Sequence, residues 1–163
     1  MTAFFILAAL TTVLDRAAKL LAQQGMTLGQ HIVVLPGVLE LRFTHNTGMA
    51  LGFLSGHAAA GIVLPLLAVI AGVLVLRRFR LSAFLLSAAG LVLGGFLGNF
   101  IDRVFFGYVV DMIYLPWLPY FICNPADIGI TAGAVLIGVS LLFRPGDWQA
   151  KGKGKAHEQN ADG

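Results

Sequence analysis

Four long apolar blocks limit the folds that this chain can adopt. They cover about residues 2–21, 58–76, 82–101 and 126–143. A helix of about 20 apolar residues spans the roughly 30 Å hydrocarbon layer of a bilayer. Charged residues make up only 12% of the chain, roughly half the share found in soluble domains. We therefore predict an all-α membrane protein with four transmembrane helices.

The first block is open to two interpretations, a cleaved signal peptide or a retained signal-anchor helix. Residues 1–10 contain no basic residue, whereas a signal peptide begins with a positively charged region. Asp15 and Lys19 also interrupt the block where the apolar core of a signal peptide would end. The retained helix is therefore favoured.

Basic residues gather at two places and predict the orientation. These places are residues 77–80, with three arginines, and the C-terminal tail, with Arg144, Lys151, Lys153 and Lys155. Segments rich in Lys and Arg stay on the cytoplasmic side of a membrane. Both termini are therefore expected in the cytoplasm, with about residues 23–57 and 102–125 outside. The net charge of +3 reflects this orientation, since no nucleic-acid-binding motif accompanies it.

We predict one membrane-embedded domain over residues 1–145, followed by a disordered cytoplasmic tail over residues 146–163 that is rich in Gly, Lys and polar residues. Within the domain, the outer segment of about residues 30–57 is expected to hold a small β-sheet. Two short apolar runs, at residues 32–35 and 38–43, flank a Pro-Gly turn. We expect this sheet to rest on the outer membrane surface.

The single cysteine, Cys123, does not indicate a catalytic or structural role for a thiol. Cys123 cannot form an internal disulfide, and no histidine stands in a motif that would make it a nucleophile. No set of His, Cys and carboxylate residues has the spacing of a metal site. We expect neither a metal nor a cofactor.

Asp111 is the first of two aspartates with catalytic potential. It lies in the apolar, β-branched segment Tyr108-Val109-Val110-Asp111-Met112-Ile113-Tyr114. Loss of water around a carboxyl group raises its pKa and favours the protonated form. The alternative is a loop aspartate in water, which these neighbours disfavour.

Asp127 is the second, in the motif Asn124-Pro125-Ala126-Asp127 at the start of the fourth block. Asn is a preferred N-cap, Pro is preferred at the first helical position, and a carboxylate at the third closes the cap. Asp127 is thus either a capping residue or a catalytic base whose charge the helix dipole stabilises. If the fold brings Asp111 and Asp127 together, the pair can share one proton and activate one water.

Further polar residues lie near the ends of the blocks. Gly94 and Gly98 form a GxxxG step, which lets another helix approach closely. Asn99, Asp102 and Arg103 follow on one face, either as a structural ion-pair network or as part of a site. The remaining candidates are Asp15 with Lys19, one helical turn apart, and the polar turn Asn46-Thr47-Gly48-Met49-Ala50.

In this order and spacing, the clusters resemble those of bacterial lipoprotein signal peptidase (signal peptidase II), an integral-membrane aspartyl endopeptidase. The resemblance covers residues 15–127. It implies a prolipoprotein substrate whose lipobox cysteine carries a diacylglyceryl group, and cleavage just before that cysteine. It also implies a multi-pass enzyme of the bacterial inner membrane, surrounded by membrane lipids, with its active site at the outer face. We expect a monomer.

Motif matching assigns roles within this resemblance. Asp111 and Asp127 correspond to the catalytic pair, and our hypothesis is that Asp127 is the base and Asp111 the initial acid. The polar residues around the pair and the substrate correspond to Asn46, Asn99, Arg103 and Asn124. The motif positions with a supporting or positioning role correspond to Asp15, Lys19 and Asp102.

Three segments depart from the family pattern. Arg16-Ala17-Ala18 replaces the more usual Gln-x-Thr or Ser, Met49-Ala50-Leu51 stands where Ala-Ala-Phe is common, and Cys123 stands where Phe is frequent. We expect these changes to alter packing or polar support near the site and to leave the aspartate pair intact.

Two other classes of function are compatible with four membrane helices. A proton-coupled transporter needs its acid near the membrane midplane, whereas the middles of the second, third and fourth blocks are uncharged. A non-enzymatic scaffold subunit would tolerate replacement of the outer aspartates, which a peptidase would not.

Overall fold

The structure is a computed structural model that describes residues 1–48 and 60–151. The helices are α1 (Thr2–Gly25), α2 (Ala60–Arg78), α3 (Ala83–Phe106) and α4 (Pro125–Phe143). Each predicted apolar block is therefore helical, although α1 and α3 run several residues further than their apolar cores. Among the described residues, α3 and α4 have the length and hydropathy of a membrane span.

Glycines on α3 bring its two neighbours into close contact. A Cβ atom on Gly94 would overlap the Ala8 carbonyl of α1, and one on Gly95 would overlap the Ala126 carbonyl of α4. Gly98 in turn lies directly against the Asp15 carboxylate. The predicted close approach at the GxxxG step is thus confirmed, and α3 packs against both α1 and α4, which also contact each other.

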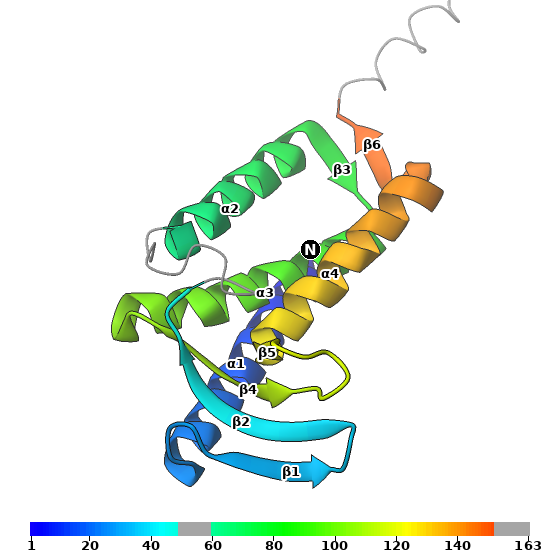
Figure 1. Cartoon of the computed structure of the whole chain (residues 1–163). Helices are drawn as coiled ribbons and strands as arrows, with labels where there is room; N and C mark the ends of the chain where they lie inside the picture. The colour runs from blue at the N-terminus through cyan, green and yellow to red at the C-terminus, as the bar shows by residue number, and fades with distance from the viewer. Residues whose placement is uncertain (49–59, 152–163) are drawn as a thin grey trace, which may run out of the picture.

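A four-stranded antiparallel sheet lies at one end of these helices (Figure 1). Its strand order is β1 (His31–Leu35), β2 (Leu39–Asn46), β4 (Val109–Tyr114) and β5 (Ile122–Cys123). The hairpin predicted for β1 and β2 is confirmed. Residues 49–57 of the predicted outer segment lie outside the described residues. The segment around Asp111 supplies the third strand, because its apolar residues Val110 and Met112 pack with Phe43 and Ala22.

A two-stranded ribbon closes the opposite end of the molecule. It pairs β3 (Phe79–Leu81) with β6 (Trp148–Ala150), which follows the short 3-10 helix η2 (Pro145–Asp147). We predicted a disordered tail from residue 146, and for residues 146–151 that prediction is wrong. Asp147 orders this stretch because its carboxylate accepts hydrogen bonds from Ser140 and Arg144, both at 2.8 Å. Residues 152–163 of the predicted tail lie outside the described residues.

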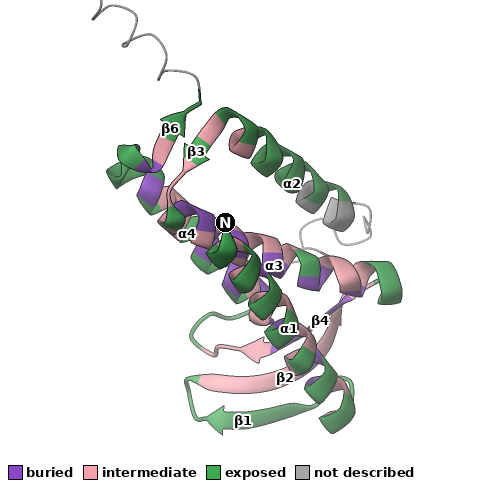
Figure 2. Cartoon of the chain, turned by 180° about the vertical axis from the view of Figure 1, so that it is seen from behind, coloured by how far each residue is buried: buried purple, intermediate pink, exposed green. Residues whose placement is uncertain are grey.

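Burial follows the pattern of a protein in an apolar solvent. Figure 2 shows exposed residues along α2 and over much of α1, and these surfaces are apolar. On α4, Leu142 and Phe143 are 76% and 75% exposed, whereas Asp15 and Lys19 on α1 are both 0% exposed. Buried charges together with exposed large apolar side chains are the pattern expected of a membrane protein.

Candidate active site

Asp111 lies near the middle of β4 and is 2% exposed. Strand β4 pairs with β2 so that Thr44 is opposite Asp111, and Asn46 ends β2 close by. The Asn46 amide donates to Asp111 Oδ2 at 2.8 Å, and the Asn124 amide donates to Asp111 Oδ1 at 2.6 Å. Sheet pairing and two amide donors therefore fix the orientation of this carboxylate.

Asp127 occupies the first turn of α4, and the predicted cap is present. The Asn124 side chain accepts from the Asp127 backbone N–H at 3.0 Å, and Asp127 Oδ2 accepts from the Asn124 N–H at 3.2 Å. The other carboxylate oxygen, Oδ1, accepts from the Asn99 amide at 2.8 Å. Asp127 is thus a capping residue that also presents one oxygen to the side chains around Asp111.

Asn124 links the two aspartates directly. Its amide nitrogen donates to Asp111 Oδ1, and its amide oxygen caps the helix at Asp127. The same nitrogen lies 3.1 Å from Asn99 Oδ1. One side chain at the start of α4 therefore ties the helix to the sheet, and it brings the two carboxylates predicted as a pair into one cluster.

The surroundings of Asp111 change its acidity. Burial raises the pKa of Asp111 from 3.8 to about 7, and the nearby Asp127 carboxylate adds to this rise. The hydrogen bonds from Asn46 and Asn124 act in the opposite direction, because they stabilise the charged form. The desolvation expected from the apolar neighbours of Asp111 is confirmed, so this group can hold a proton near neutral pH.

A buried lysine lies behind the aspartates. Lys19 Nζ contacts Asp15 Oδ2 at 2.7 Å, Asp102 Oδ2 at 2.9 Å and Asn99 Oδ1 at 2.9 Å. The i, i+4 pair predicted for Asp15 and Lys19 is confirmed, and α1 and α3 are joined through it. We call Asp15, Lys19, Asn99 and Asp102 the lysine cluster.

The lysine cluster also binds the backbone beside each aspartate. Asp15 Oδ1 accepts from the Ala126 N–H at 3.0 Å, one residue before Asp127. Asp102 Oδ2 accepts from the Val110 N–H at 3.1 Å, one residue before Asp111. The cluster therefore fixes the main chain on both sides of the site.

Two arginines complete the polar surroundings. Arg16 pairs with Asp102 Oδ1 and lies 5.8 Å from the ring centre of Phe106. This contact of Arg16 was not predicted, because the sequence shows Arg16 only as a departure from the family pattern and adjacent helical residues do not share a face. Arg103 donates to the Asn99 carbonyl at 3.4 Å and to the Gly48 carbonyl at 3.2 Å. Among the residues predicted as one network, Asp102 thus turns to α1, whereas Arg103 reaches the chain that follows β2.

Cys123 lies beside the site, directly before Asn124, and is buried. Burial raises the pKa of the Cys123 thiol to about 11, so the thiol is neutral at physiological pH. In residues 1–48 and 60–151, no three His, Cys, Asp or Glu side chains form a group that could hold a metal ion. The positions Met49 and Ala50 of the predicted polar turn lie outside the described residues.

Comparison with known proteins shows the family of this chain. The family model described as Signal peptidase (SPase) II matches residues 7–143. The chain belongs to this family. The resemblance found in the sequence motifs is therefore confirmed over most of the chain.

Relatives match at nearly full length. A lipoprotein signal peptidase of Enterococcus faecalis is 33% identical over 153 residues, which cover 93% of each chain. One of Symbiobacterium thermophilum is 39% identical over 142 residues, covering 85% of this chain and 90% of the relative. One of Pseudomonas putida is 36% identical over 150 residues, covering 86% of each.

Two solved structures share the fold. Both are described as a bacterial membrane enzyme structure obtained by the in meso method, at 2.3 Å and 1.9 Å resolution. The first has a TM-score of 0.81 and 32% identity, covering 87% of this chain and 88% of the other. The second has a TM-score of 0.77 and 31% identity, covering 88% and 94%. This signal peptidase II chain is thus mostly helical with a small antiparallel sheet, and it shares this fold with two solved structures of bacterial membrane enzymes.

Proposed function

We propose that this chain is an aspartyl endopeptidase that removes the signal peptide of diacylglyceryl-modified prolipoproteins by cutting before the lipidated lipobox cysteine. Membership of the signal peptidase II family supports the reaction class, since its relatives carry the name lipoprotein signal peptidase. The observation that carries the proposal is the link through Asn124, which binds the Asp111 carboxylate and caps the helix at Asp127. Two coupled carboxylates that share one proton suit general acid–base hydrolysis.

The proposed mechanism needs one water, and no covalent bond forms between the enzyme and the substrate. Asp127 accepts a proton from the water, whose oxygen attacks the carbonyl carbon of the scissile bond. Asp111, which holds a proton near neutral pH, donates it to the carbonyl oxygen. Collapse of the tetrahedral intermediate breaks the C–N bond as Asp127 gives its proton to the leaving amine, and a hydroxyl of the intermediate returns a proton to Asp111 as the carbonyl re-forms. The two carboxylates titrate as a coupled pair, which has two apparent pKa values.

The supporting residues receive roles from their contacts. Asn46, Asn99 and Asn124 orient the carboxylate oxygens through their amide groups. Asp102 and Asp15 of the lysine cluster hold the backbone at Val110 and Ala126, so these two carboxylates position the catalytic pair without touching its side chains. Arg103, which binds the Gly48 carbonyl, holds the chain directly after β2 beside α3.

We further propose that all four helices cross the bacterial inner membrane, with both termini cytoplasmic and the aspartates at the outer face. The arginines at residues 77–80 lie at the end of the molecule opposite the sheet, as the positive-inside rule requires. Trp117 and Tyr120 are 65% and 94% exposed on the loop between β4 and β5, where aromatic residues mark an interface. The extensive apolar surface is in contact with lipid, and the working unit is a monomer.

The test of this function is a cleavage assay with the purified full chain. The substrate is a lipobox peptide with a diacylglyceryl group on its cysteine, and the same peptide without the lipid is the specificity control. Asp111→Asn and Asp127→Asn are each expected to abolish cleavage while the protein still inserts and unfolds cooperatively. Glu40→Gln is the matched control, because Glu40 is an acid of the same sheet whose side chain, among residues 1–48 and 60–151, pairs with Arg42 at 2.7 Å. Cleavage that persists in a well-inserted Asp111→Asn or Asp127→Asn protein refutes the aspartate pair.

A further inference from the structure

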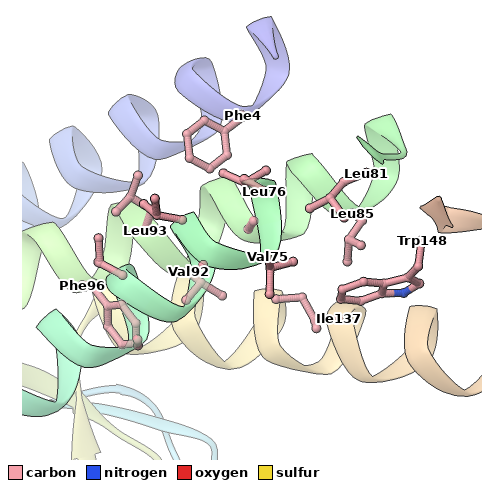
Figure 3. A pocket seen from close by; sticks show the side chains of 15 residues that line it. Phe4, Val75, Leu76, Leu81, Leu85, Val92, Leu93, Phe96, Ile137 and Trp148 are labelled. Carbon is pink, nitrogen blue, oxygen red and sulfur yellow. The ribbon is translucent and has the colours of Figure 1, made fainter. Parts of the chain in front are cut away.

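An apolar cavity of about 280 Å³ lies between α2 and the other three helices. Figure 3 shows side chains of α1, α2, α3 and α4 converging on this space, with Trp148 at one end and Phe96 at the other. Its walls are apolar, and the one indole N–H of Trp148 already donates to Ser140 Oγ at 3.2 Å. A water molecule needs two or more polar partners, so the cavity suits a hydrocarbon chain.

A basic cluster stands at the Trp148 end of this cavity. Arg77 and Arg78 directly follow Leu76, and Arg80 directly precedes Leu81, both of which line the cavity. Lys151 reaches the same place, because its Nζ donates to the Leu76 carbonyl at 2.6 Å. Within the part of the chain that the structure describes, Asp147 is the acid of this region, and it is bound to Arg144. The cavity mouth therefore carries a net positive charge.

We propose that this cavity holds one acyl chain of an anionic glycerophospholipid of the cytoplasmic leaflet, and that Arg77, Arg78, Arg80 and Lys151 bind its phosphate. Basic groups at the cytoplasmic ends of membrane helices are a common binding site for anionic headgroups. The leaflet follows from the orientation proposed above, whereas the binding itself does not depend on the proposed peptidase activity. The lipid fills the space between α2 and α3 and stabilises the position of α2.

The acyl chain of the prolipoprotein is the competing occupant. On α3 the cavity runs from Leu85 to Phe96, and the lysine cluster begins at Asn99. Leu85 and Asn99 are 14 positions apart (99 − 85), which is about 21 Å along a helix. A substrate bound at the aspartates would place its polar groups far from the basic cluster, so the positive mouth favours a phospholipid.

The first test fills the cavity. Gly72 lines it, and a Cβ atom there would meet nothing within 4 Å, so Gly72→Leu places a side chain in the cavity without disturbing the backbone. Gly138→Leu is the matched control, since Gly138 is an intramembrane glycine of α4 with equal room and lies outside the cavity lining. Purified protein is titrated with phosphatidylglycerol or phosphatidylcholine, and bound lipid is counted by native mass spectrometry while Tm is recorded. Wild type and Gly138→Leu are expected to retain one phosphatidylglycerol and to gain Tm from it, and Gly72→Leu to do neither.

The second test removes the charge and leaves the cavity. Arg77→Gln with Arg80→Gln is expected to lower the preference for phosphatidylglycerol over phosphatidylcholine by about tenfold or more. Arg77→Lys with Arg80→Lys retains the charge and is expected to keep the preference. Because these side chains are on the surface, the variants report on binding even if the cavity variant folds poorly.

Three results would overturn the proposal. Equal retention of both lipids by wild type would contradict the proposed headgroup site. Retention of phosphatidylglycerol by Gly72→Leu would contradict the proposed acyl-chain site. An increased KM for the lipidated peptide in Gly72→Leu, with phosphatidylglycerol binding intact, assigns the cavity to the substrate instead. Failure of the peptidase assay alone leaves the lipid-binding result unaffected, so the two proposals are separable.

Discussion

The two ends of α3 are stabilised by opposite means. At the end beside the sheet, called the outer end after the orientation proposed above, Asn99 and Asp102 are buried against charged side chains, and Lys19 contacts two carboxylates. At the inner end, Leu85 and Ala88 are buried among apolar groups, and an apolar cavity remains open beside them. In one half of this helix the buried polar side chains are paired, whereas in the other half an apolar cavity remains beside the buried side chains.

This difference shows how the side chains of a site can keep a fixed geometry although the apolar surroundings of the protein do not impose one. Each buried charge costs several kcal/mol unless it is paired with good geometry, so the outer end has few alternative arrangements. Apolar contacts lack that directionality, and lipid can replace a protein side chain at little cost. We therefore expect substitutions at the outer end to have large and specific effects and those at the inner end to be tolerated.

Removal of the buried cation should have the largest effect on stability. Lys19→Met leaves Asp15 and Asp102 without their shared partner, which we expect to lower the free energy of unfolding by about 3–5 kcal/mol. Thermal or denaturant unfolding in detergent micelles measures this change. Lys151→Met at the inner end is the control and should unfold much as wild type does. If both variants were equally stable, the contrast between the two ends would be wrong.

Asn124 tests whether the outer end serves catalysis rather than stability alone. Asn124→Ala removes both the cap and the donor to Asp111, and we expect kcat to fall by about 10²–10³-fold, as for loss of one catalytic hydrogen-bond donor. Asn124→Ser restores a good N-cap without the amide. It should recover stability and leave kcat low. Recovery of kcat by the serine variant would assign Asn124 to capping only.

The pH profile should reveal the acid of the pair. Because the pKa of Asp111 is about 7, cleavage should fall about tenfold per pH unit above that value as the group loses its proton. The folded protein also binds this proton more tightly than the unfolded chain, whose pKa is 3.8, so stability due to Asp111 decreases as pH rises from about 4 to 7. Asp111→Asn should abolish this part of the pH dependence of unfolding. An unchanged unfolding profile in that variant would contradict the raised pKa.

The smallest effect is expected at the inner end. Ser140 donates to Asp147 at 2.8 Å and accepts from the Trp148 indole, which joins α4 to the β3–β6 ribbon. Ser140→Ala should lower the free energy of unfolding by about 1–2 kcal/mol and leave kcat unchanged. A large loss of kcat would show that the inner end influences the site after all.

Much of this contrast could be predicted from the sequence. Long apolar blocks identify helices because length and hydropathy are local properties, and the cap at Asn124-Pro125-Ala126-Asp127 is defined by four adjacent residues. Asp111 and Asp127 could be predicted as candidate catalytic residues because an apolar chain contains few acidic residues. The pairing of Asp15 with Lys19 followed from helical spacing alone.

The rest depends on contacts between distant segments. Strand β4 lacks the alternation of apolar and polar residues and the adjacent turn that indicate the β1–β2 hairpin, and only its pairing with β2 brings Asp111 beside Asn46. Arg16 finds Asp102 across the interface of α1 and α3, which no local pattern encodes. The β3–β6 ribbon was missed for the same reason, because each strand has three residues and a partner about 70 positions away.

The hydrogen bond between Asp15 and the Ala126 N–H joins the first helix to the last, across 111 positions of sequence. In the proposed topology, α1 enters the membrane during synthesis before α4 leaves the ribosome. The proposed protease would therefore be inert on a nascent chain and would gain its activity only when the final segment is inserted. Unfinished or truncated copies would then pose no proteolytic threat to other proteins passing through the same membrane.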